Sequence, residues 1–273
     1  MMKRTVFFVS DRTGITAEML GQSLLTQFDD VEFERQSLPF IDGPEKALAA
    51  VAAINAAACA EAQRPLVFST LVAEAPRAIL QTANALVLDF FQAFISPLET
   101  ELGVKSSHTV GRSHGMAQSE LYDRRIDAMN YTLSHDDGLT PRGLEEAELI
   151  LVGVSRSGKT PTCLYLALQC GIKTANYPLI PEDLDAMRLP GNLERHRNKV
   201  WGLTIRPERL HQIRSERRPS SEYAAVANCR REVQAAERLM ESHGVSFFDS
   251  TNRSIEELAT VILQEARLER HLF

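Results

Sequence analysis

The chain has 273 residues, of which 44% are apolar and 24% charged, a balance typical of globular proteins that bury their own core. The formal net charge of −6 argues against a nucleic-acid-binding protein, because counterion release needs a dense basic surface. No apolar stretch approaches the length of a membrane span. We therefore expect a cytoplasmic protein with neither a nucleic-acid nor a membrane partner.

Strands and helices alternate along the first third of the chain, which is typical of a parallel α/β sheet. The alternation rests on apolar runs, helical periodicity and Pro44 in the first turn of an alanine-rich helix. In chain order, we predict a strand at 5–10, a helix at 16–28, a strand at 31–38, a helix at 44–62, a strand at 65–71, a helix at 75–83 and a strand at 85–91.

The pattern weakens between residues 96 and 118, which are rich in Ser, Gly and His. We interpret this segment as an irregular functional loop or a crossing segment. Within it, Arg112, Ser113, His114 and Gly115 are either part of an ordinary surface loop or a candidate phosphate contact. A helix is predicted from residue 119 to Gly138, and turn residues come after it. We place a domain boundary here, giving an N-terminal α/β domain at 1–142 and a kinase-like domain at 143–273.

The second half of the chain restarts the alternation. In chain order, we predict a strand at 147–155, a helix at 158–171, strands at 174–180 and 199–205, helices at 207–218 and 222–244, a strand at 245–251 and a helix at 254–272. The predicted fold class is therefore α/β, with an N-terminal parallel α/β domain followed by a P-loop kinase-like α/β domain. Four cysteines without metal-like spacing are predicted to be buried free thiols in a reducing cytosol.

A complete G-x-x-x-x-G-K-[ST] motif lies between a predicted strand and a predicted helix, the context that this motif requires. We call residues 153–160 the phosphate loop; it consists of Gly153, Val154, Ser155, Arg156, Ser157, Gly158, Lys159 and Thr160. The glycines let backbone N–H groups point inward, where they bind phosphate together with the helix N-terminus. Lys159 is expected to reach the phosphates, and Thr160 to offer its hydroxyl to Mg²⁺.

Phosphoryl transfer also needs a carboxylate for the metal or for the acceptor proton. Asp89 and Asp249 end apolar strands, but neither fits a Walker-B position well. The better candidates are Asp136 and Asp137, shortly before the loop strand. Acidic residues at a helix C-terminus oppose the helix dipole, and this unfavourable placement favours a functional role.

Two further segments are left with two interpretations each. Residues 10–16, SDRTGIT, repeat the strand–turn–helix theme without a lysine, and either hold a second anion or simply begin a capped helix. Ser254 and Glu257 fit a capping box at the start of the last helix, which explains most of the pattern, or this strand–loop–helix segment lies against a nucleotide base.

Several blocks together resemble one family, the bacterial phosphoenolpyruvate synthase regulatory proteins, which are related to the regulatory proteins of pyruvate, phosphate dikinase. The resemblance covers nearly the whole chain, and its blocks occur in the same order. They are SDRTGITAEMLG, YTLSHDDG, GVSRSGKTPTCLYLA, ANYPLI, GLTIRPERL and STNRSIEELA. Gly158 before the lysine and the PTCLYLA segment after it favour the phosphoenolpyruvate synthase branch.

The resemblance implies a bifunctional enzyme. It implies ADP-dependent phosphorylation of a threonine of phosphoenolpyruvate synthase, which inactivates the target, and its reversal by inorganic phosphate with release of diphosphate. We expect Lys159 and Thr160 to act in both directions in one pocket, with Asp136 or Asp137 handling the hydroxyl proton or Mg²⁺.

Alternatives remain open at this stage. They are the same chemistry on pyruvate, phosphate dikinase, an ATP-dependent small-molecule kinase with HQIRSERR as an arginine-rich lid, and a non-enzymatic nucleotide-sensing regulator. The sequence also leaves the oligomeric state open, a homodimer included.

Overall fold

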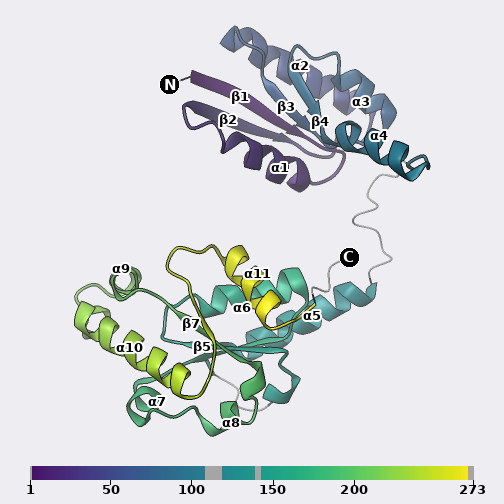
Figure 1. The fold of residues 1–273 in the computed structure, drawn as a ribbon. Helices are drawn as coiled ribbons and strands as arrows, with labels where there is room; N and C mark the ends of the chain where they lie inside the picture. Colours follow the sequence, from purple (N-terminus) through teal and green to yellow (C-terminus); the bar gives the residue numbers. More distant parts are fainter. Residues whose placement is uncertain (1, 108–118, 139–142, 270–273) are drawn as a thin grey trace. The chain divides into compact units, whose positions relative to one another are not determined.

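A computed structural model of the chain describes residues 2–107, 119–138 and 143–269. The chain divides into two compact units, Met1–Gly115 and Met116–Phe273, and each contains its own parallel four-stranded sheet (Figure 1). The α/β class and the presence of two α/β parts are therefore confirmed. No helix among the described residues is both long enough and apolar enough to cross a bilayer.

The first unit has the strand order β2-β1-β3-β4. Its strands are β1 (Met2–Val9), β2 (Val31–Leu38), β3 (Leu66–Ser69) and β4 (Leu86–Asp89). Its helices are α1 (Ile15–Leu25), α2 (Pro44–Glu61), α3 (Glu74–Leu80) and α4 (Phe90–Leu102). The order of the strands reverses between β1 and β3, so the loops after these two strands meet at a topological switch point, where ligands of open α/β sheets bind.

The second unit has the order β6-β5-β7-β8, which is the same arrangement. Its strands are β5 (Leu149–Gly153), β6 (Thr174–Pro178), β7 (Val200–Thr204) and β8 (Phe247–Asp249). Its helices are α5 (Ser119–Ser134), α6 (Lys159–Cys170), α7 (Pro181–Ala186), α8 (Gly191–Glu194), α9 (Pro207–Arg217), α10 (Val226–Ser242) and α11 (Ile255–Glu265). The phosphate loop comes directly after β5 and lies at the switch point of this sheet.

Each central strand is buried on both faces, as a parallel sheet covered by helices requires. In β5, Leu149 and Leu151 pack with residues of α6 and α11, whereas Ile150 and Val152 pack with residues of α9 and α10 on the other face. Successive side chains of a strand point to opposite faces, so one apolar run supplies two layers of core. This explains why the run before the phosphate loop shows no alternation.

The predicted irregular segment at 96–118 is wrong in its first part, because α4 continues to Leu102. Its start is capped by the Asp89 side chain, which accepts a hydrogen bond from the backbone N–H of Gln92 (2.9 Å). Pro97 inside the helix and its exposed apolar side chains hid the helical pattern. The candidate phosphate contact at Arg112, Ser113, His114 and Gly115 lies outside the described residues.

Along the chain, the division between the two units falls between residues 115 and 116, whereas the sequence led us to expect it between 142 and 143. The reason is that α5 packs in the second unit, where the Thr132 hydroxyl accepts a hydrogen bond from the backbone N–H of Thr174 in β6 (3.1 Å). One cysteine also differs from expectation. Cys163, Cys170 and Cys229 are buried, but Cys59 is exposed, because it lies on the outward face of α2.

Candidate functional site

The phosphate loop leaves the sheet through a glycine that no other residue can replace without a shift of the backbone. A Cβ at Gly153 would lie 2.2 Å from the carbonyl oxygen of Leu203 in β7, and the backbone there has φ +147°. Gly158 adopts φ +94° and directly precedes α6. These two glycines allow residues 154–158 to curl at the helix N-terminus, as anion binding by backbone N–H groups requires.

Lys159 is buried within the loop and leaves only 4% of its surface exposed. Its Nζ atom donates a hydrogen bond to the carbonyl oxygen of Val154 (2.9 Å). Burial lowers the pKa of Lys159 to about 8, and the nearby carboxylates of Asp136 and Asp137 act against this shift. Burial also raises the pKa of the Cys163 thiol, one turn later in α6, so this thiol stays uncharged. A buried ammonium held in this way gains strongly from an anionic ligand.

The two acidic candidates lie beside the phosphate loop. The Thr160 hydroxyl donates a hydrogen bond to Oδ1 of Asp136 (3.0 Å). Asn176 of β6 donates from Nδ2 to the same Asp136 oxygen (2.5 Å) and to the Thr160 hydroxyl (2.9 Å). Its contact to Oδ1 of Asp137 is longer, at 3.5 Å. The helix predicted to reach Gly138 ends at Ser134, and Asp137 adopts φ +52° in the turn after it.

A pocket with a volume of about 300 Å³ opens in front of the loop. Its walls come from the turn after α5, the phosphate loop, the start of α6 and the last turns of α9. The lining residues are Asp137, Ser155, Arg156, Gly158, Lys159, Thr160, Pro161, Ile213 and Arg217. Three of these side chains are cationic and one is anionic, so the pocket favours an anionic ligand.

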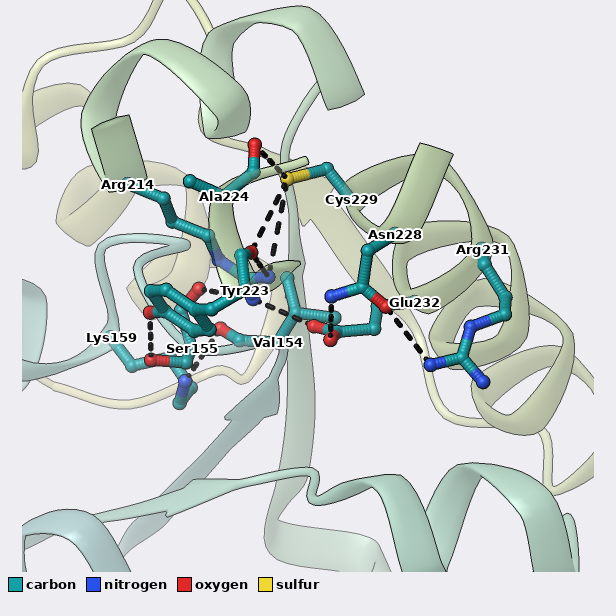
Figure 2. A network of polar contacts seen from close by, with 10 residues as sticks. All are labelled: Val154, Ser155, Lys159, Arg214, Tyr223, Ala224, Asn228, Cys229, Arg231 and Glu232. Carbon is teal, nitrogen blue, oxygen red and sulfur yellow. Dashed lines mark hydrogen bonds and ion pairs between the residues drawn. The ribbon is translucent and has the colours of Figure 1, made fainter. Parts of the chain in front are cut away.

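A buried arginine connects the phosphate loop to α10 (Figure 2). Arg214 of α9 is fully buried and donates from Nη2 to the carbonyl oxygen of Ser155 (3.1 Å) and to Oε2 of Glu232 (2.7 Å). Its Nη1 donates to the carbonyl oxygen of Tyr223 (3.0 Å), and its guanidinium lies 4.1 Å from the centre of the Tyr223 ring.

Ser155 is therefore held on two sides, because the Tyr223 hydroxyl also lies 2.9 Å from the Ser155 hydroxyl (Figure 2). A third support comes from the segment after β8, where the Ser250 hydroxyl donates a hydrogen bond to the carbonyl oxygen of Ser157 (2.8 Å). Contacts from three separate segments thus fix the loop. A preorganised loop spends less binding energy on its own ordering.

Sequence reasoning missed three of these residues, namely Asn176, Arg214 and Tyr223. The available clues were weak: a single polar residue inside the β6 segment ANYPLI, and an arginine in HQIRSERR whose burial no pattern reveals. The capping box at the last helix is confirmed, since the Ser254 hydroxyl accepts from the backbone N–H of Glu257 (3.2 Å). Asp249 instead accepts a hydrogen bond from the backbone N–H of Thr251 (2.8 Å).

The loop, the buried lysine and the pocket have the features expected of a phosphate-binding site, and comparison with known proteins identifies the family of the chain. A family model described as "Kinase/pyrophosphorylase" matches residues 6–263. The chain belongs to the kinase/pyrophosphorylase family. The resemblance found from the sequence is therefore confirmed over nearly the full chain, and the family's description joins two phosphate-transfer activities.

Relatives in three bacteria match almost end to end. A protein of Aromatoleum aromaticum is 55% identical over 271 residues, which covers 99% of this chain and 98% of the relative. A protein of Laribacter hongkongensis is 55% identical, with 98% of each chain covered. A protein of Burkholderia multivorans is 55% identical over the full length of both chains. Each relative carries the name "Putative phosphoenolpyruvate synthase regulatory protein".

Proposed function

We propose that this chain is a bifunctional regulator of phosphoenolpyruvate synthase: with ADP it phosphorylates a threonine of that enzyme, and with inorganic phosphate it removes the phosphoryl group again as diphosphate. The single observation that supports this most is the phosphate-loop pocket, in which Lys159 is buried beside Asp136 and Asp137. The family membership and the names of the relatives support the choice of substrate classes.

The phosphate loop is the proposed site of the nucleotide's phosphates. The backbone N–H groups at the start of α6 and the ammonium of Lys159 would surround the β-phosphoryl group of ADP. Its arrival gives Lys159 a full anionic partner in place of the Val154 carbonyl oxygen that it contacts now. Phosphoryl transfer needs mainly positioning and charge neutralisation, and both are features of this pocket.

Thr160 and Asp136 fit a magnesium ion, because a hydroxyl and a carboxylate oxygen lie 3.0 Å apart and are the ligand types that Mg²⁺ prefers. Among the described residues no group of three or more His, Cys, Asp or Glu side chains is placed to hold a metal. This is compatible with Mg²⁺, which commonly takes one or two protein oxygens and completes its shell with phosphate oxygens and water. Bound there, the ion would neutralise charge on the phosphates.

The two aspartates can be given separate roles. Asp136 is engaged by Thr160 and Asn176, which suits it to the metal side of the site. Asp137 lines the open pocket and has only a 3.5 Å contact to Asn176, so it is free to accept the proton of an incoming threonine hydroxyl. In the reverse direction the same carboxyl group would return a proton to the threonine oxygen as it leaves.

The deciding experiment incubates the purified chain with phosphoenolpyruvate synthase, ADP and Mg²⁺, and tracks the target's mass and activity. We expect one added phosphoryl group on a threonine, formation of AMP, and loss of synthase activity; inorganic phosphate should then restore the activity and release diphosphate. Parallel reactions use ATP, small hydroxyl acceptors, and pyruvate, phosphate dikinase.

Each parallel reaction tests one alternative. Turnover with ATP and a small acceptor would establish a metabolite kinase instead. Modification of the dikinase in preference to the synthase would transfer the proposal to the other target. Inhibition of the synthase without any change in its mass would indicate a regulator that acts by binding alone.

A further inference from the structure

Two arginines of the phosphate-loop pocket are not explained by the nucleotide's transferred phosphate. Arg156 lies inside the loop, and Arg217 lies in the last turn of α9. Both line the pocket, and neither side chain forms a hydrogen bond or ion pair with a described residue. Other arginines of this region are paired: Arg214 with Glu232, and Arg230 with Glu208.

The fold holds both arginines beside the pocket, and for Arg156 it does so at a cost in backbone strain. Arg156 adopts φ +74°, a left-handed backbone conformation that non-glycine residues rarely populate. Arg217 lies one helical turn after Ile213, so the two side chains share the face of α9 that lines the pocket. Arg214, between them in sequence, is buried and ties α9 to the Ser155 carbonyl oxygen. The Arg217 position is thereby fixed relative to the phosphate loop.

The proposed chemistry requires two neighbouring phosphate positions. In one direction the threonine oxygen forms a bond to the β-phosphorus of ADP, the bond from that phosphorus to the bridging oxygen breaks, and AMP leaves. In the other, an oxygen of inorganic phosphate forms a bond to the phosphorus of phosphothreonine, the bond to the threonine oxygen breaks, and that oxygen takes a proton. Inorganic phosphate therefore acts from the position that the α-phosphate of AMP occupies.

We propose that Arg156 and Arg217 form this second oxyanion subsite, which takes the α-phosphate of the nucleotide in one direction and inorganic phosphate in the other. The inference rests on the proposed function for its ligands. Guanidinium groups suit the task because they form paired hydrogen bonds to phosphate and stay charged throughout the accessible pH range. Together with Lys159, they give the pocket enough positive charge for two phosphate groups.

A binding experiment tests the subsite without relying on turnover. Diphosphate spans both positions, so its affinity for the full-length protein is measured by calorimetry for the wild type, Arg217→Gln and Arg218→Gln. Arg218 is the matched control: it is the next residue, exposed, and outside the pocket lining. We expect Arg217→Gln to weaken diphosphate binding about tenfold to a hundredfold, the usual effect of losing charge-assisted hydrogen bonds. Arg218→Gln should stay within about twofold of the wild type.

Kinetics adds a second test of the same subsite. AMP should compete with inorganic phosphate in the phosphorylase direction, raising its apparent KM without lowering the maximal rate, and Arg217→Gln should raise the KM for phosphate. The subsite is overturned if Arg217→Gln binds diphosphate like the wild type, or if AMP and phosphate bind together. If diphosphate binding depends on Arg217 but no target is modified, the subsite stands and the proposed function fails.

Discussion

The two units share one arrangement of strands, β2-β1-β3-β4 and β6-β5-β7-β8, yet among the described residues the loops after their first strands carry different side chains. In both units a loop leads from the first strand into a helix, from β1 to α1 and from β5 to α6 (Figure 1). The residue before each helix is a glycine with positive φ, Gly14 at +85° and Gly158 at +94°. The topology thus places a loop before a helix N-terminus at the same point of each sheet. The side chains around each position decide its chemistry.

In the first unit the loop uses its own polar groups. Ser10 accepts a hydrogen bond from the backbone N–H of Arg12 (3.2 Å), and Asp11 accepts one from the backbone N–H of Val72 (3.2 Å). Glu18 lies in the first turn of α1, where it adds negative charge near the helix N-terminus. The SDRTG segment therefore has two carboxylates nearby, Asp11 and Glu18, against the single cation Arg12, and its helix begins without a side-chain cap. Whether it holds a second anion stays a prediction.

In the second unit the first turn of α6 has no acidic residue and begins with Lys159 itself. The charge that balances this lysine comes from Asp136 and Asp137, which a different segment of the chain supplies. A shared topology therefore places a loop, whereas the charge and the supports of that loop decide whether it binds phosphate. Changes in charge, support and pH can test that difference, and the largest effect is expected at Lys159.

Lys159→Ala should remove the cationic side chain that distinguishes the phosphate loop from the loop of the first unit. We expect the rates of ADP-dependent phosphorylation and of phosphate-dependent reversal both to fall about a hundred- to a thousandfold, because one charged group serves both directions. Rates are measured by mass spectrometry of the target and by diphosphate release. Arg12→Ala in the first unit is the control and should leave ADP affinity unchanged. Intact phosphorylase activity in Lys159→Ala would show that the two activities use separate pockets.

Arg214→Leu should show how much the stability of the second unit depends on the buried arginine that supports the phosphate loop. Arg214 is the one arginine that is fully buried among the described residues, and removing it leaves Glu232 without its cationic partner. Loss of one member of a buried pair lowers the free energy of unfolding by about 3–5 kcal/mol. Urea denaturation measures this change, with the exposed Arg218→Leu as the control. A loss of less than about 1 kcal/mol, the range of surface pairs, would contradict the structural role.

Asp136→Asn should test the negative charge of this side chain apart from its hydrogen bonds. The amide keeps the shape of the side chain and an oxygen that can accept them. We expect the phosphorylation rate to fall about tenfold to a hundredfold and the Mg²⁺ concentration for half-maximal rate to rise. Asp249→Asn, the same change at the end of β8, is the matched control and should have little effect. Equal losses in both variants would assign no special role to Asp136.

The pH dependence of ADP binding should show the smallest effect. The pKa of free Lys159 is about 8, and a bound phosphate raises it, so binding above pH 8 must take up a proton. ADP affinity should be nearly constant below about pH 7, fall about twofold by pH 8 and fall about fivefold more between pH 8 and 9. Calorimetry in buffers of different ionisation enthalpy measures the proton uptake. Lys159→Arg, which stays charged, should abolish this dependence, and proton release by the wild type would contradict it.

Much of this protein was determined locally by its sequence. The strand before Gly153, the helix after Lys159 and the loop between them result from an apolar run, two glycines and a helical pattern, which are properties of neighbouring residues. The α4 helix escaped prediction because its Pro97 and its exposed apolar side chains resemble an irregular segment.

Only the tertiary structure decided which distant residues complete the site. Asn176 lies beside Asp136 because β6 pairs in parallel with β5, placing it opposite Leu151. Arg214 is buried because α9 and α10 close over it, and a charged side chain is buried only where the fold supplies partners such as Glu232 and the Ser155 carbonyl oxygen. Such partners are far apart along the chain, and their meeting depends on strand order and helix packing, which no local pattern contains.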